Sequence, residues 1–207
     1  MLPALAAAFA LQAAGPQSDP DARVLAIIDV ETTGLRPGYH EMIDIGAVYT
    51  DPHGRVLGEF FVRITPDHPD RAGDIARSIN GFDEARWAAL EASGEAEAAA
   101  AFIAFHEEIV GERTALFTAF NAHFDRAFVD AWLKEEGQAG VSELFTYYML
   151  DLPSLAWGRG YRGLNGDALA EAVGIEPETS DPMQHTGQSG AAWNLAFYNA
   201  LMAADPR

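Results

Sequence analysis

The sequence predicts an α/β protein with a mixed β-sheet flanked by helices on both faces. Two observations predict it: three early strand-like segments follow one another closely, and later strand-like segments alternate with helical patterns. Strands joined by tight turns pair antiparallel, whereas strands joined through helices pair parallel, so the sheet is expected to be mixed. A chain of 207 residues suits one domain with a sizeable core.

The first half of the domain is expected to form a meander of three strands. The apolar run at residues 24–28 is rich in β-branched residues and is typical of a buried strand. The turn at residues 51–54 contains Pro52 and Gly54 and joins the second strand to the third. Residues 66–81 show little periodicity and are expected to form a loop. The predicted strands lie near residues 24–30, 41–50 and 55–63.

The second half is expected to alternate helices with strands. Phe124, Phe128 and Trp132 recur every four residues, as on the buried face of a helix. A last amphipathic helix is expected to begin near His185. The other predicted elements are helices over 95–110, 124–136 and 164–173, and strands over 114–119 and 147–152.

Residues 1–22 are predicted to be an apolar N-terminal segment with a linker, ahead of a domain over 23–207. The segment is too short to span a bilayer, and no basic residue precedes Arg23, whereas secretion signals begin with basic residues. We therefore expect a cytoplasmic protein without a membrane span. The segment is expected to pack on the domain, on a partner protein or on a second copy, and secretion is the alternative.

Two acidic residues, Asp29 and Glu31, directly follow the first apolar strand. Side chains two apart on a strand point to the same face, so these two carboxylates are expected to lie side by side. Crowded carboxylates at the end of a buried strand suit a divalent cation, and hard oxygen ligands favour Mg²⁺ or Mn²⁺. The same short pattern also occurs at solvated strand ends, so it needs support from other segments.

Two later segments give that support. Asn121 and Asp125 lie where the strand at 114–119 passes into the helix at 124–136. Strand-to-helix junctions are common places for binding sites in α/β folds. His185 comes at the start of the last helix, and histidine is suited to proton transfer near neutral pH.

These segments, in this order, resemble the motifs of the DEDDh-type 3′–5′ exonucleases, a DnaQ-like group of the ribonuclease H-like superfamily. Residues 29–35 match the first motif, residues 41–47 match the segment after it, and residues 121–125 match the second motif. Phe120 stands where relatives often have histidine. The resemblance covers about residues 23–203. It implies a ribonuclease H-like mixed sheet and a site for two divalent cations, Mg²⁺ or Mn²⁺.

The third motif departs from the family pattern, in which a histidine is followed five residues later by an aspartate. His185 fits, but Gly190 stands in place of the fourth carboxylate. The nearest acids, Glu178 and Asp181, lie outside the expected register, and no acidic residue occurs between Asp181 and Asp205. We therefore expect weakened metal binding and low activity, which Gly190→Asp is expected to raise.

The resemblance also implies roles for individual residues. Asp29, Glu31 and Asp125 are the expected catalytic metal ligands, and His185 is the expected general base. Candidates for contact with the substrate are Thr32, Thr33, Leu35, Asn121 and Phe124, although Phe124 is as well explained by core packing.

The loop at residues 158–163 is the most basic stretch of an acidic chain. Arg159 and Arg162 flank Tyr161, an arrangement that can stack a base and bind a phosphate. The alternative is an ordinary exposed loop.

The net charge of −18 argues against tight binding of long duplexes, because an acidic surface repels phosphate. The absence of cysteine excludes a disulfide or a thiolate metal site. The expected function is a metal-dependent 3′–5′ exonuclease acting on a single-stranded or frayed 3′ end of DNA or RNA. Two alternatives stay open: a degenerate module that binds a nucleic-acid end or a protein, and a different phosphoesterase on the same fold.

Overall fold

A computed structural model describes residues 22–204 of the chain, and the predicted N-terminal segment lies almost wholly outside them. Six strands form one mixed sheet in the order β4-β3-β2-β1-β5-β6. The first three make the predicted antiparallel meander, and β5 and β6 extend the sheet parallel to β1. The strands are β1 (Arg23–Thr32), β2 (Met42–Thr50), β3 (Val56–Thr65), β4 (Ser93–Gly94), β5 (Thr114–Ala119) and β6 (Phe145–Asp151).

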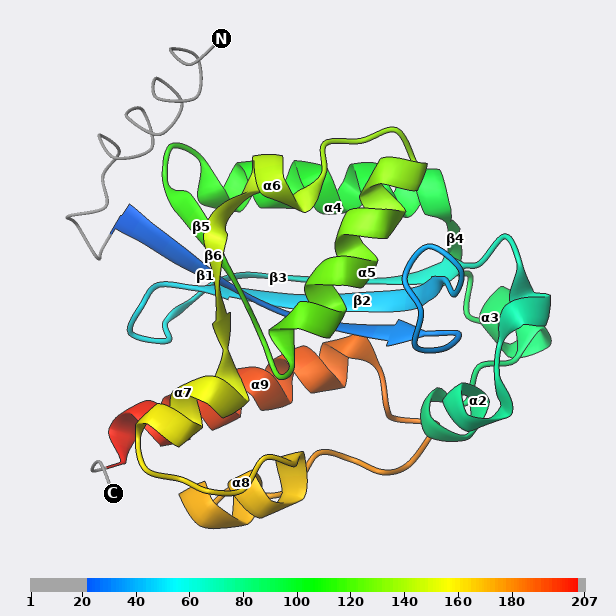
Figure 1. Ribbon diagram of the computed structural model, residues 1–207. Helices are drawn as coiled ribbons and strands as arrows, with labels where there is room; N and C mark the ends of the chain where they lie inside the picture. The colour runs from blue at the N-terminus through cyan, green and yellow to red at the C-terminus, as the bar shows by residue number, and fades with distance from the viewer. Residues whose placement is uncertain (1–21, 205–207) are drawn as a thin grey trace, which may run out of the picture.

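Helices cover both faces of this sheet, as Figure 1 shows. On one face lie α4 (Glu95–Val110), α5 (Ala122–Glu135) and α6 (Val141–Leu144). On the other lie α7 (Leu152–Gly158), α8 (Gly166–Val173) and α9 (Gly187–Ala203). Two short helices, α2 (Asp74–Asn80) and α3 (Glu84–Ala89), lie beside the end of β1 where Thr32 stands. The predicted mixed sheet with helices on both faces is confirmed.

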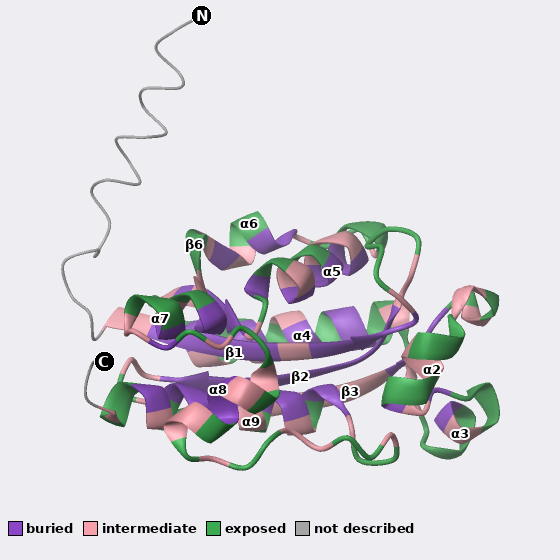
Figure 2. Ribbon diagram, turned by 60° about the horizontal axis from the view of Figure 1, so that its bottom comes forward, coloured by how far each residue is buried: buried purple, intermediate pink, exposed green. Residues whose placement is uncertain are grey.

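The side chains of β1 alternate between the two helical layers. Val24, Ala26 and Ile28 pack into the core that includes α4 and α5, whereas Leu25 and Ile27 pack into the core that includes α8 and α9. Figure 2 shows the strands buried between these layers. This alternation continues through the end of the strand, so Asp29 and Glu31 belong to the face that α9 covers.

Most predicted elements match within two residues, but short helices were missed. Residues 66–81, predicted to be a loop, contain the 3₁₀ helix Pro69–Arg71 and α2. The sequence also gave no sign of α3, α6 and α7. Each has seven residues or fewer, too few for a helical period to show, and α3 and α7 begin at capping aspartates instead. Asp83, for example, accepts a hydrogen bond from the backbone of Arg86 at the start of α3.

No helix within residues 22–204 combines the length and the apolar character that a membrane crossing requires.

Candidate active site

The first part of the site is the end of β1, which lies against the first turn of α9. In the antiparallel pairing with β2, Asp29 stands opposite Gly46 and Glu31 opposite Asp44. A β-carbon built on Gly190 would lie 2.1 Å from Oδ2 of Asp29. The Asp29 carboxylate therefore fills the space where a side chain at position 190 would begin.

Asp125 reaches this strand from the other helical layer. Asn121 adopts left-handed backbone angles, with φ of 63°, and so turns the chain sharply from β5 into α5. This turn places Asp125 in the first turn of α5, where the helix dipole favours a carboxylate. Oδ1 of the buried Asp125 side chain accepts a hydrogen bond of 3.2 Å from the backbone N–H of Val30. Asp125 is thereby attached to β1 between the two acids of that strand.

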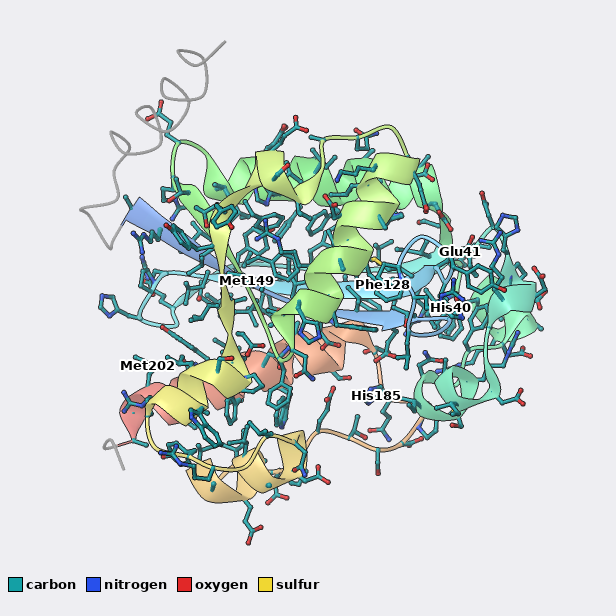
Figure 3. All side chains as sticks on the ribbon, in the orientation of Figure 1. His40, Glu41, Phe128, Met149, His185 and Met202 are labelled. Carbon is teal, nitrogen blue, oxygen red and sulfur yellow. The ribbon has the colours of Figure 1, made fainter. Side chains whose placement is uncertain are left out.

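His185 completes the group, and Figure 3 shows it on the segment that leads into α9. Its Nε2 lies 3.0 Å from Oε1 of Glu31, and its Nδ1 lies 2.8 Å from the backbone oxygen of Thr179. A carbonyl only accepts, so Nδ1 carries a proton and Nε2 is directed at Glu31. The hydrogen bond to Glu31 is the main cause that raises the pKa of His185 to about 9. His185 is therefore protonated at neutral pH in this geometry.

The carboxylates at this site repel one another. Burial, then the charges of Asp125 and Glu178, raise the pKa of Asp29 well above its usual range. Burial is also the main cause that raises the pKa of Asp125, although the N–H of Val30 opposes the rise. Asp29 and Asp125 therefore hold their protons more tightly than exposed aspartates, because their ionised forms lose hydration and repel one another.

Two acids that were not among the predicted site residues belong to this group. Asp44 on β2 is fully buried, and burial raises its pKa to about 7. Its Oδ1 accepts a hydrogen bond from Gly187, while its Oδ2 has no partner in the described part of the chain. An acid inside an apolar strand was a usable signal for Asp44. Glu178 lies on the irregular segment between α8 and α9, and no pattern in the sequence there indicated a site residue.

The start of α9 is held close to the sheet by its own residues. Thr186 and Ser189 form a reciprocal capping box directly after His185. A β-carbon on Gly46 would lie 2.0 Å from the backbone oxygen of Gly187, so both glycines are needed for this close approach. The glycines of the third motif let the helix begin against β2, although glycine weakens a helix intrinsically.

The predicted convergence of three carboxylates on one ion is not present in this geometry. Within residues 22–204, no three histidine or acidic side chains stand close enough together to hold a metal ion as they are. The physical reason is that separate groups hold them: Glu31 pairs with His185, and Asp125 with the N–H of Val30. The chemistry of the set nevertheless fits a hard cation, since the donors are carboxylate oxygens and two enclosed ones nearby, Oδ2 of Asp44 and Oε1 of Glu178, have no hydrogen-bond partner among the described residues.

The predicted substrate residues have different environments. Thr32 and Thr33 are buried, and the Thr33 hydroxyl accepts from the N–H of Glu41. Leu35 is 80% exposed just beyond β1. Phe124 packs on Phe128, with ring centroids 4.8 Å apart, which supports its alternative role in the core.

Asn121 lines an open cavity of about 370 Å³. The cavity lies where β5 and β6 end, and because these strands run parallel to β1, their carboxyl ends share one edge of the sheet. Ligands of open α/β sheets bind at this edge. The other lining residues are Asp151, Pro153, Ser154, Trp157 and Leu164.

The basic loop does not join the acidic group. Tyr161 is only 3% exposed and packs in the core, so the predicted stacking of a base on it is wrong. Arg159 donates to the backbone oxygen of Ala204, just past the end of α9, a helix about 25 Å long at 1.5 Å per residue. Arg162 lies over the ring of Trp157, with its guanidinium carbon 4.5 Å from the ring centroid, and Trp157 is one of the residues that line the cavity.

Comparison with known proteins gives one family and one fold. The family model described as Exonuclease matches residues 26–188. Exonuclease I from Methylocaldum szegediense has a similar structure, with a TM-score of 0.71 and 17% identity over 89% of this chain. The structure of E. coli exonuclease I in complex with a dT13 oligonucleotide has a TM-score of 0.69 and 17% identity over 87% of this chain. The zinc-bound form of the E. coli exonuclease I–ssDNA complex has a TM-score of 0.70 and 18% identity over 89% of this chain.

These matches cover 41% of each of those three proteins, so the chain spans about two fifths of their length. No curated protein matches the sequence.

Proposed function

The chain belongs to the Exonuclease family, and from that premise we propose that it is a metal-dependent 3′–5′ exonuclease that removes nucleotides from single-stranded ends. The observation that carries the proposal is the gathering of Asp29, Glu31, Asp125 and His185 at the carboxyl end of β1. These residues come from three separate segments. Burying acids that repel one another destabilises a protein, so their burial together favours a functional role.

Hydrolysis of a phosphodiester needs an activated water and a clamp on the charge that develops on the leaving oxygen. Two divalent cations would supply both when they are bound. Asp29, Glu31 and Asp125 are the residues that would hold them. His185 is the base that takes a proton from the attacking water. Because His185 is protonated while it pairs with Glu31, that pair has to separate before His185 can accept a proton.

The substrate is proposed to be a single strand. The solved complexes of E. coli exonuclease I contain single-stranded DNA, and the cavity beside Asn121 has room for a nucleobase. Trp157 and Leu164 offer exposed apolar surface there, 49% and 63% exposed respectively. Arg162 adds positive charge next to Trp157 in a chain that is otherwise strongly acidic. We propose that a base near the strand end stacks in this cavity, while the phosphate lies at the acidic group.

Trp157→Ala is expected to weaken binding of a single-stranded oligonucleotide by about 5- to 150-fold, since stacking of one base contributes about 1–3 kcal/mol. Trp157→Phe keeps an aromatic face and is expected to retain most of the affinity. Fluorescence anisotropy with a labelled oligonucleotide in Ca²⁺ buffer measures both variants. Equal affinity in the parent and Trp157→Ala would remove the cavity from the proposed path of the strand.

The proposed activity is tested with a 5′-labelled single-stranded oligonucleotide, titrated with Mg²⁺ and Mn²⁺. The expected result is a ladder that shortens from the 3′ end, stops with a chelator and is absent when the 3′ end is blocked. Fragments from internal cuts would favour a different phosphoesterase. Binding without cleavage at any metal concentration would favour the degenerate module.

A further inference from the structure

Gly190 leaves the site one carboxylate short of the family motif, and the segment between α8 and α9 brings another acid to the same place. We propose that Glu178 is the fourth carboxylate of the site and takes the role of the side chain that Gly190 lacks. This inference rests on the proposed function, because it assigns Glu178 to the cation site of the same reaction.

The carboxylate of Glu178 lies beside His185. Its Oε1 lies 3.9 Å from Nδ1 of His185, whereas Glu31 lies beside the other ring nitrogen, Nε2. This oxygen is enclosed, yet it has no hydrogen-bond partner among residues 22–204. Its charge also raises the pKa of Asp29 and Asp125. An enclosed carboxylate oxygen without a donor suits a cation ligand.

Position 190 itself has no room for an acid. A β-carbon there would meet three atoms of the Asp29 carboxyl group within 3 Å, and the first turn of α9 already touches the backbone of β2 at Gly46. A fourth carboxylate therefore has to approach from outside the helix. The hydrogen bond between His185 and the carbonyl of Thr179 fixes the segment beside the site and so positions Glu178.

Asp181, the other nearby acid, is occupied elsewhere. Its Oδ1 accepts from the N–H of Met183 at 3.0 Å, and its Oδ2 accepts from Nε2 of Gln184 at 2.8 Å. It is exposed and caps the turn on which it lies. Asp181 therefore supplies a matched control: an acid of the same segment, three residues away, with no place in the group.

The test compares Glu178→Gln with Asp181→Asn in the full chain. Isothermal titration with Mn²⁺ alone measures metal affinity, and thermal unfolding in chelator confirms that each variant folds. Glu178→Gln is expected to lower Mn²⁺ affinity by at least about 10- to 100-fold, the loss seen when a residue that supports a metal site is removed. It is also expected to raise the metal-free melting temperature, because a repelling charge is gone. Asp181→Asn is expected to leave Mn²⁺ affinity at the parent value.

Cleavage of the labelled oligonucleotide separates this inference from the proposed function. If the parent cleaves the oligonucleotide and Glu178→Gln binds Mn²⁺ as tightly as the parent, the role of Glu178 is overturned. The proposed exonuclease function then stands. Weakened Mn²⁺ binding in Glu178→Gln, with no cleavage by the parent, supports Glu178 as a ligand and overturns the exonuclease. A parent that binds no Mn²⁺ overturns both.

Discussion

Asp29→Asn is expected to abolish metal-dependent cleavage while raising the melting temperature of the metal-free protein. The charges of Asp125, Glu178 and Glu31 act on this carboxylate, and removing it takes away a proposed metal ligand together with a repelling charge. A loss of activity of at least about 100-fold is expected, the upper range for groups that merely support a metal site. A change that inactivates and stabilises at once is the signature of a strained functional site.

The pH dependence of this stabilisation follows from the direction of the pKa shift. The pKa of Asp29 is raised above its usual value of 3.8, so the folded state holds the proton more tightly than the unfolded state. Its contribution to stability is complete below pH 3.8 and is lost as the pH rises through the folded pKa. The gain from Asp29→Asn should therefore grow with pH, and added Mn²⁺ should stabilise the parent but not the variant.

Glu59→Gln is the matched control, because it removes one exposed carboxylate from β3 of the same sheet. Thermal unfolding in chelator between pH 5 and 9, with the oligonucleotide assay, compares the three proteins. A large loss of stability in Asp29→Asn would show that the carboxylate is structural.

Gly190→Ala is expected to lower Mn²⁺ affinity and cleavage strongly, with little change in stability. The added methyl group would lie 2.1 Å from Oδ2 of Asp29, so that carboxylate has to turn out of its place. Alanine also stabilises a helix by about 1 kcal/mol relative to glycine, which offsets part of the crowding. The functional loss should therefore exceed any loss of stability.

This contact revises the expectation drawn from the motif alone. Gly190→Asp was expected to raise metal affinity by restoring a missing ligand, but its β-carbon would displace Asp29 in the same way. We now expect Gly190→Asp to weaken metal binding. Gly158→Ala is the control, since a β-carbon at the last residue of α7 meets no atom within 4 Å among the described residues. Titration with Mn²⁺ and the oligonucleotide assay measure all three variants, and full activity in Gly190→Ala would contradict the crowding.

The sequence alone was sufficient where the information is local. The two-residue period of a strand placed Asp29 and Glu31 on one face, and the structure has β1 alternate in that way as far as the acids. The helix over 95–110 and the strand over 114–119 were predicted with the bounds that the structure gives. These features depend on backbone geometry within one element, so a short window of sequence contains them.

Tertiary structure alone decided which segments meet. Gly187 and Asp44 are 143 positions apart, yet their hydrogen bond holds α9 on the sheet beside the site. The same packing set Gly190 directly against the Asp29 carboxylate and brought Glu178 beside His185. It also buried Tyr161, which its neighbours suggested was exposed. Contacts of this kind depend on strand order and on the path of irregular segments, which no period in the sequence encodes.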